Sequence, residues 1–103
     1  MASRRTRDEG RARRVRIRAE AREEILAALT WYAERDARVA RAFAHALSSC
    51  VRGLRRFPHR YPELRTPSRR AWVRRFPYKL LYFVTDEAIV ITALRHTSRD
   101  DAT

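Results

Sequence analysis

The sequence predicts an α+β fold of order β-α-α-β-β-β, in which a helical hairpin packs on one face of a small, mostly antiparallel sheet. Three observations predict it. Residues 14–18 alternate between arginine and an apolar residue, which is typical of a short half-buried strand. Residues 20–56 carry apolar side chains at helical spacing. Residues 71–95 read as three consecutive strands, and the last two are apolar on both faces.

The first strand is predicted to lie at an edge of the sheet. Val15 and Ile17 would face the core, while Arg14, Arg16 and Arg18 would face solvent. Charged side chains along a strand protect its unpaired edge from other chains. We therefore expect 14–18 to be an edge strand.

The first helix is predicted over residues 20–35. Its apolar positions form one stripe, made of Ala21, Ile25, Ala28, Leu29 and Tyr32. Three carboxylates lie in the first turns, where the positive end of the helix dipole stabilises them: Glu20, Glu23 and Glu24. We interpret these glutamates as helix-start residues, since nothing else in the sequence supports acid–base catalysis by them.

The second helix is predicted over residues 37–56, with Asp36 as its N-cap. Proline disfavours helical geometry in the residue before it, so Phe57-Pro58 should end the helix. The apolar stripe consists of Val39, Phe43, Ala46, Leu47, Cys50 and Leu54. The short link between the two stripes predicts a helical hairpin.

A proline-rich loop at 57–70 precedes the predicted strands 71–76, 78–85 and 88–95. Pro77 marks a bend or bulge between the first two, and Thr85-Asp86-Glu87 reads as a hairpin turn. The last two strands are the most apolar, so we expect them to be central.

Strict alternation assigns the side chains of these strands to two faces. Tyr78, Leu80, Tyr82 and Val84 share one face, opposite Leu81 and Phe83; in the next strand Ile89, Ile91 and Ala93 lie opposite Val90 and Leu94. A single helical layer covers only one face of a sheet. The sequence therefore predicts an exposed apolar groove on the other face, which a partner would cover.

The charge predicts an acidic or polyanionic partner. The chain carries 24 basic and 12 acidic residues, for a net charge of +12. Residues 1–13 are expected to form a disordered basic arm, and 14–103 a single domain. Asn and Gln are absent and all but one of the basic residues are arginine, so genomic base composition is an alternative source of this bias. Two glycines are too few for a glycine-rich phosphate loop.

The remaining composition bears on location and cofactors. No apolar run approaches the ~20 residues that span a bilayer, so no membrane association is expected. The single cysteine, Cys50, fits a reducing compartment, and we expect a cytoplasmic protein. His45 and Cys50 have no further ligand nearby, so neither a metal site nor a cofactor is predicted.

Several segments together resemble the RelE/ParE superfamily of toxins from type II toxin–antitoxin systems. The resemblance covers residues 14–100 and rests on the order and spacing of the opening strand, Ala21-Arg22-Glu23-Glu24-Ile25-Leu26, Trp31-Tyr32, Leu54-Arg55-Arg56-Phe57-Pro58, Arg75-Phe76-Pro77-Tyr78-Lys79-Leu80-Leu81-Tyr82-Phe83-Val84 and Leu94-Arg95-His96-Thr97-Ser98-Arg99-Asp100. The terminal His-x-x-Arg-Asp is more similar to the ParE branch.

The resemblance implies a β-α-α-β-β-β toxin neutralised by a small cognate antitoxin, through which it would contact DNA. A ParE-like toxin is not a nuclease and inhibits DNA gyrase. The alternative is a RelE-like, metal-independent endoribonuclease that cuts mRNA on the ribosome. A harmless relative that serves only in an autoregulatory complex is a third reading.

Two sets of candidate residues follow. For partner binding the candidates are Trp31, Trp72, Arg74, Leu81, Phe83, Val90 and Leu94. For the nuclease alternative they are His96, Arg75, Lys79, Arg95 and Arg99, with His96 as the group that titrates near neutral pH. RelE-like nucleases usually carry a tyrosine near the C-terminus, and no tyrosine follows Tyr82 here. We therefore expect no catalytic activity.

Overall fold

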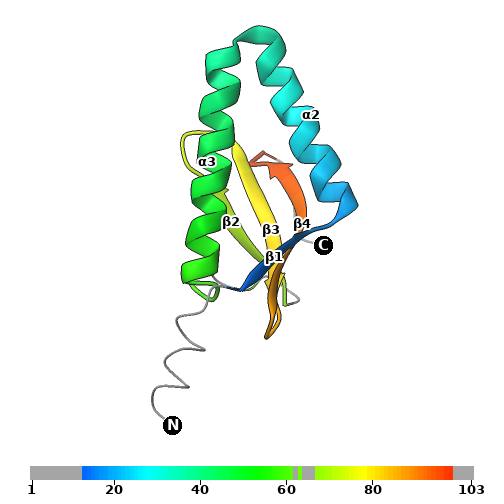
Figure 1. Ribbon diagram of the computed structural model, residues 1–103, viewed down its shortest axis with the longest axis vertical. Helices are drawn as coiled ribbons and strands as arrows, with labels where there is room; N and C mark the ends of the chain where they lie inside the picture. The colour runs from blue at the N-terminus through cyan, green and yellow to red at the C-terminus, as the bar shows by residue number, and fades with distance from the viewer. Residues whose placement is uncertain (1–12, 62, 64–66, 99–103) are drawn as a thin grey trace.

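The computed structural model describes residues 13–61, 63 and 67–98, and confirms the predicted fold class (Figure 1). A helical hairpin lies against a four-stranded mixed sheet. The elements are β1 (Arg14–Ile17), α2 (Ala19–Arg35), α3 (Ala37–Arg56), β2 (Arg69–Val73), β3 (Tyr78–Val84) and β4 (Ala88–His96). Residues 1–12 of the predicted arm and Arg99 lie outside the described residues.

The sheet order is β1-β4-β3-β2. β1 pairs in parallel with β4, whereas β3 pairs antiparallel with both β4 and β2. The prediction of central β3 and β4 strands is confirmed, and so is the edge position of β1. The opposite edge of the described sheet belongs to β2.

β2 begins and ends earlier than the predicted strand 71–76. Its end is set by a tight turn, in which the Phe76 N–H donates to the carbonyl oxygen of Val73 at 3.1 Å. Within this turn Arg75 has a φ of 71°, a left-handed conformation that a strand excludes. Arg74 and Arg75 therefore lie in the turn and not in the strand.

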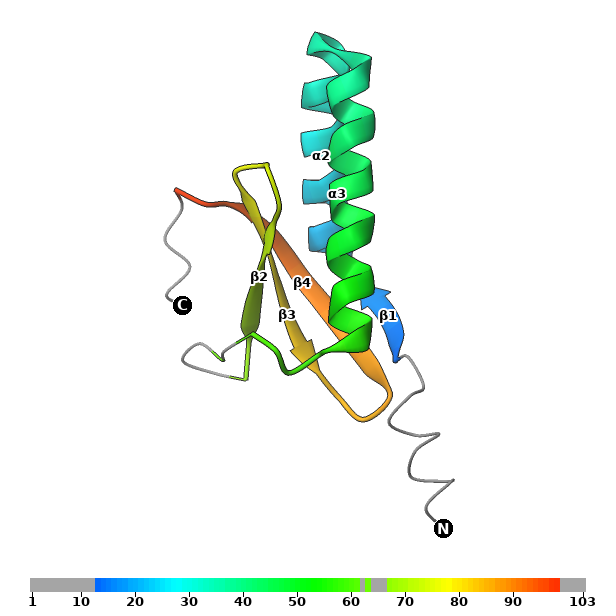
Figure 2. The same ribbon diagram turned by 90° about the vertical axis from the view of Figure 1, so that its left-hand side faces the viewer.

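Both helices lie on the same side of the sheet (Figure 2). Asp36 caps α3 as predicted, because its carboxylate accepts from the Arg38 N–H at 2.9 Å. The chain passes from α2 to α3 through this one residue, so the helices form a tight antiparallel hairpin. None of the described helices is long and apolar enough to cross a membrane.

An aromatic cluster joins the hairpin to the β2–β3 turn. Phe43 is 0% exposed, and its ring lies 5.1 Å from Tyr32, 5.0 Å from Phe76 and 5.3 Å from Tyr78, centroid to centroid. These tilted and edge-on arrangements are the favourable geometries for aromatic pairs. Deeper in the molecule the same face of the sheet packs Leu54, Leu80, Tyr82, Ile89 and Ile91.

An irregularity in β4 corrects the predicted faces. Tyr82 pairs with Ile91 but Leu81 pairs with Ala93, so Thr92 is an extra residue opposite β3. A bulge reverses the side-chain alternation beyond it. Leu94 consequently lies in the helix-facing core at 4% exposure, and its predicted position on the opposite face is wrong.

Glu24 connects α2 to the end of β4. β1 ends opposite Ile91, so the edge of β4 beyond that residue has no neighbouring strand among those described. There the Glu24 carboxylate accepts from the Leu94 N–H at 2.9 Å and from the Arg95 guanidinium at 2.8 Å. The sequence indicated Glu24 only as a helix-start residue. Its carboxylate also accepts the Leu94 N–H hydrogen bond that a neighbouring strand would otherwise accept.

Glu24→Ala is expected to lower the free energy of unfolding by about 1–3 kcal/mol, because a partly buried amide and Arg95 both lose their acceptor. Urea denaturation measures the change. Glu23→Ala, one position earlier on the same helix, is the control and should cost well under 1 kcal/mol (~0.5). Equal losses in the two variants would show that the contact to Leu94 contributes nothing.

Candidate partner-binding surface

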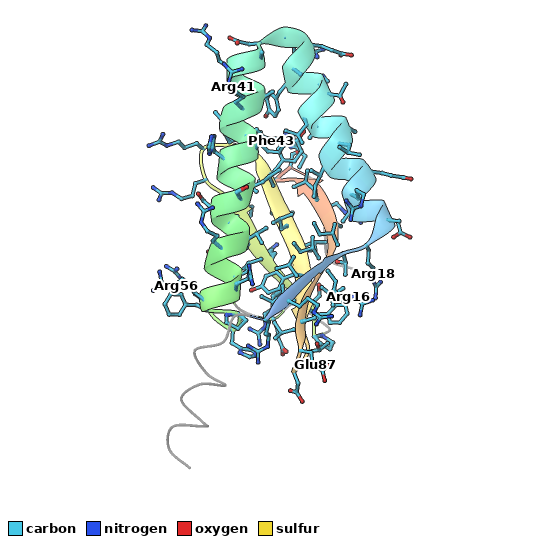
Figure 3. All side chains as sticks on the ribbon, in the orientation of Figure 1. Arg16, Arg18, Arg41, Phe43, Arg56 and Glu87 are labelled. Atoms are coloured by element: carbon cyan, nitrogen blue, oxygen red, sulfur yellow. The ribbon has the colours of Figure 1, made fainter. Side chains whose placement is uncertain are left out.

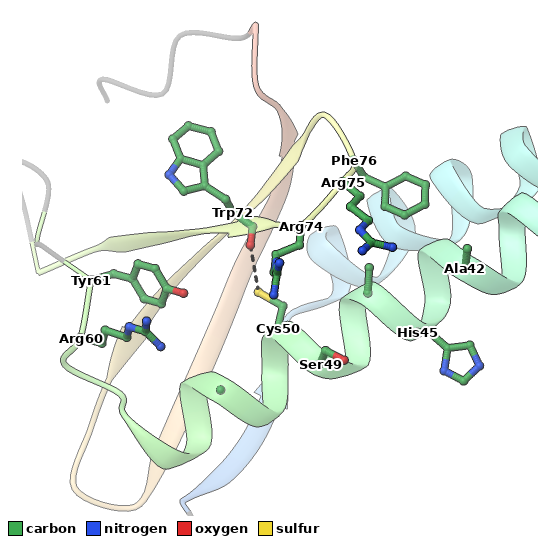
Figure 4. Close-up of a pocket in the computed structure, with 12 residues that line it drawn as sticks. Ala42, His45, Ser49, Cys50, Arg60, Tyr61, Trp72, Arg74, Arg75 and Phe76 are labelled. Carbon is green, nitrogen blue, oxygen red and sulfur yellow. Dashed lines mark hydrogen bonds between the residues drawn. The ribbon is translucent and has the colours of Figure 1, made fainter.

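A groove runs between α3 and the outer edge of β2 (Figure 4). Its volume is about 640 Å³. It is bounded by α3, by the loop after α3, and by β2 with the turn that follows it. The residues that line this α3/β2 groove are Ala42, His45, Ala46, Ser49, Cys50, Gly53, Arg60, Tyr61, Trp72, Arg74, Arg75 and Phe76.

Small side chains on α3 keep the groove open. Ala42, Ala46, Cys50 and Gly53 recur at helical spacing along the side of α3 next to β2. A Cβ atom added at Gly53 would meet nothing within 4 Å. The floor is therefore weakly polar, and space is left open above Gly53.

The rim of the groove is basic. Arg60, Arg74 and Arg75 line it, and none of the described aspartates or glutamates does. In Figure 4 the guanidinium groups of Arg74 and Arg75 lie between the β2 side and α3. Uncompensated positive charge around an apolar floor favours a partner with acidic and apolar side chains.

The β2 side of the groove is a strand edge. Among the described residues no strand pairs with the outer side of β2, apart from a single bridge between Glu63 and Arg69 at its start. The carbonyl oxygen of Trp72 faces α3 and accepts from the Cys50 thiol at 3.7 Å. Such an edge offers main-chain hydrogen bonds to an added strand.

Cys50 is a hydrogen-bond donor here and not a nucleophile. Burial raises the pKa of its thiol from 9.0 to about 11. The thiol is consequently protonated at neutral pH, which agrees with its bond to Trp72. The interpretation of Cys50 as a packed thiol fits this position at the edge of the core.

Raising the pH is expected to destabilise the fold through Cys50. The thiol pKa is higher in the folded chain than its ordinary value of 9.0, so its stabilising contribution is complete below pH 9 and disappears as the pH rises toward about 11. Cys50→Ala should lose less stability between neutral pH and pH ~10 than the parent chain. Ser49→Ala keeps the thiol and is the control. Identical pH dependence of all three chains would contradict the assignment.

The sheet face opposite the helices is less open than the sequence predicts. Trp72 is 48% exposed, and Phe83 and Val90 are half-buried, but Leu81 is only 8% exposed. The prediction of an exposed apolar groove along β3 and β4 is therefore wrong. Trp72 remains accessible at one end of this face, and Phe83 and Val90 remain partly accessible at the other.

Cations cover the aromatic rings of this face. The Arg18 guanidinium lies 5.5 Å from the Phe83 ring centroid. Arg70 and Lys79 each lie 5.6 Å from the Trp72 ring. Lys79 is 2% exposed, which is unusual for an ammonium group. This face combines aromatic and basic groups, as the groove does.

A second hollow, of about 700 Å³, lies between α2 and the ends of β3 and β4. It is lined by four of the predicted site residues, Trp31, Leu94, Arg95 and His96, next to Tyr78. Trp31 is 50% exposed, and the Arg35 guanidinium stacks 3.7 Å from its ring centroid. The His96 Nδ1 accepts from the Ser98 N–H at 3.2 Å, which places the proton of the neutral ring on Nε2.

The candidates for nuclease chemistry are brought together only in part. Lys79 pairs with Arg95 and Tyr78 pairs with His96, so the Lys79 and His96 side chains point to opposite faces of the sheet. Arg95 is held by Glu24, and Arg75 lies in the α3/β2 groove. Arg95 and His96 both line the hollow beside α2, whereas Lys79 lies on the opposite face of the sheet and Arg75 lines the α3/β2 groove.

His45, Arg60 and Tyr61 are among the groove residues that were not predicted as site residues. Arg60 and Tyr61 come from the proline-rich loop, whose path no periodicity determines, and His45 had been weighed only as a metal ligand. The pattern that could have revealed Arg60 and Tyr61 is a cation and an aromatic residue just before an edge strand. In the part of the chain that the structure describes, no three His, Cys, Asp or Glu side chains are grouped to hold a metal ion.

Comparisons with known proteins agree with this architecture. No curated protein matches the chain. Among solved structures, a chain of the chromosomal ParDE TA system from P. aeruginosa superposes with a TM-score of 0.70 at 13% identity, over 82% of this chain and 96% of that one. At that identity the likeness shows the fold alone. The family model of the ParE toxin of the type II toxin–antitoxin system parDE matches residues 15–101, nearly the whole domain, and the chain therefore belongs to the family of ParE toxins of type II toxin–antitoxin systems.

Proposed function

We propose that this toxin inhibits DNA gyrase by protein–protein contact in the cytoplasm and is neutralised by a cognate antitoxin that occupies the α3/β2 groove. DNA would be reached through the antitoxin. The observation that carries the proposal is the combination in one groove of an apolar floor, three arginines without an acid, and an unpaired strand edge.

The groove would take an acidic, partly apolar segment of the antitoxin. Its floor suits the apolar side chains of such a segment, Arg74 and Arg75 would pair with its carboxylates, and β2 would accept its backbone as a strand. The accessible residues of the opposite sheet face, Trp72, Phe83 and Val90, are proposed to continue this surface around β2. Leu81 and Leu94 are too buried to contribute without rearrangement.

A binding mode of inhibition fits the site geometry better than catalysis. His96 and Lys79 lie on opposite faces of the sheet, and Arg95 is engaged by Glu24. Trp31, by contrast, is a half-exposed aromatic residue on α2, which does not line the groove, and it lies beside a separate hollow. Tryptophan is the residue most enriched at interface hot spots, and we propose Trp31 as a contact to gyrase.

A supercoiling assay with purified gyrase tests the proposal. The chain should inhibit at micromolar concentration, and its antitoxin should relieve the inhibition. Trp31→Ala is expected to weaken inhibition by at least about tenfold. Leu26→Ala, which removes another exposed apolar side chain from α2, is the matched control and should inhibit like the parent. Absence of inhibition by correctly folded chain would reject gyrase as the target.

The nuclease alternative predicts a different readout. If the toxin cut mRNA on the ribosome with His96 as the titrating group, a translation extract would show cleaved message that disappears with His96→Ala. Message that stays intact, together with inhibited supercoiling, decides for gyrase. If expression without antitoxin does not arrest growth, and neither supercoiling nor message is affected, the chain is the harmless relative.

A further inference from the structure

The two helices of the hairpin carry opposite charge. α2 has four glutamates and two arginines, whereas α3 has five arginines and no acidic residue. The arginine-rich composition of the chain therefore does not by itself explain α3, since glutamate was available to the neighbouring helix. Positive charge is concentrated on one element.

Four of the α3 arginines share one side of the helix. At about 100° per residue, Arg38, Arg41, Arg52 and Arg56 fall within roughly 60° of arc and span about 27 Å along the axis. All four are exposed, and Figure 3 shows Arg41 toward one end of α3 and Arg56 at the other. We refer to these four residues as the α3 basic stripe. The α3/β2 groove lies beside it, on the flank formed by Ala42, Ala46 and Cys50.

Little inside the fold neutralises the stripe. Arg38 contacts Asp36 at 3.5 Å, but among the described residues Arg41, Arg52 and Arg56 form no ion pair. Arg52 donates to the Ser49 hydroxyl at 3.1 Å, and Arg56 lies 5.4 Å from the Phe57 ring. Like charges three or four residues apart destabilise a helix, and Arg38 and Arg41 also lie near its positive end. A polyanion would relieve this repulsion.

We propose that the α3 basic stripe binds the phosphate backbone of duplex DNA directly. Arginine contacts phosphate through two parallel hydrogen bonds, and over a length of about 27 Å a DNA strand presents several phosphates to such a stripe. The proposed contacts are to phosphates, which carry no sequence information, so binding is independent of sequence.

This direct contact would add to the contact through the antitoxin, and it departs from the expectation that DNA is reached only through the antitoxin. It does not depend on which enzyme the toxin inhibits. Binding of the stripe to DNA would keep the toxin close to any target or partner that is bound to the same DNA.

Fluorescence anisotropy with a random-sequence 25-base-pair duplex (about 85 Å long by the rise of B-DNA) tests the proposal on the full chain. The variant Arg41→Gln/Arg52→Gln/Arg56→Gln should bind at least about tenfold more weakly and reduce the slope of log K against log salt by about 2–3. The control Arg16→Gln/Arg22→Gln/Arg35→Gln removes the same charge from exposed positions on β1 and α2. It should change the slope by less than 1 (~0.5).

Three outcomes would overturn the proposal. Equal losses in the two triple variants would show an effect of net charge alone. Unchanged binding by the stripe variant, with circular dichroism like the parent, would place DNA binding elsewhere. Polyglutamate of equal charge that displaces the duplex as well as unlabelled duplex does would assign the stripe to an acidic protein. Because these positions do not line the groove, the result is separable from antitoxin binding and from gyrase inhibition.

Discussion

Replacing Phe43 by alanine is expected to lower the free energy of unfolding by about 3–5 kcal/mol. The side chain is fully buried and its ring contacts Tyr32, Phe76 and Tyr78, so its loss leaves a cavity where the hairpin meets the β2–β3 turn. Since domains of this size are stable by about 5–15 kcal/mol, the loss is a large fraction of the total. Urea unfolding followed by circular dichroism measures it.

Val39→Ala is the matched control, because Val39 lies one turn earlier on α3 at 36% exposure. It should cost less than about 1 kcal/mol. If the two variants lost the same stability, the aromatic cluster would not be the centre of the fold.

The largest expected effect on binding comes from reversing charge in the groove. Arg74→Glu/Arg75→Glu should weaken binding of the cognate antitoxin at least about 100-fold, which corresponds to about 2.7 kcal/mol. The reason is that two cations on the groove rim, with no acid beside them, become anions facing an acidic segment. Isothermal titration calorimetry measures the affinity.

The control for this variant is Arg22→Glu/Arg35→Glu, which makes the same change in net charge on α2. It should alter antitoxin affinity by less than about fivefold. Retained affinity in the groove variant, or equal loss in both, would remove the groove from the antitoxin interface. Both double variants are to be checked for parent-like circular dichroism, since Arg75 occupies a turn position with positive φ.

The helices could be predicted because their information is local. The apolar spacing of α2 and α3, the Asp36 cap and the stop at Phe57-Pro58 each depend on neighbours in sequence, and the structure confirms them. The position of β1 at a sheet edge was predictable for the same reason. The parallel pairing of β1 with β4 was not predictable, because it joins residues that are more than 70 positions apart in sequence.

The strand faces could be predicted only up to Thr92. A bulge is not visible in a pattern of apolar residues, and it moved Leu94 from the predicted open face into the core. The burial of Leu81 was missed because alternation says which face a side chain is on and not what its neighbours on that face cover. The predicted exposed groove along β3 and β4 depended on both assignments.

The candidate site was predictable in part. Trp72 and Arg74 were selected from the sequence, and both line the α3/β2 groove. Arg60 and Tyr61 were not selected, because they reach the groove through a loop whose course depends on tertiary contacts. One of these contacts is the hydrogen bond that the Tyr82 hydroxyl donates to the Pro58 carbonyl oxygen at 3.1 Å. The hydrogen bond from the Leu94 N–H to Glu24 was missed because it depends on how far β4 extends beyond the end of β1, which the sequence pattern does not show.

Hydrogen exchange of the toxin, alone and bound to its antitoxin, tests the central claim most directly. We predict that binding slows amide exchange in β2 and the turn after it, residues 69–76, and along the groove-facing part of α3, residues 42–53. Protection confined to α2, with β2 exchanging as fast in the complex as in the free chain, would contradict the assignment of the groove to the antitoxin.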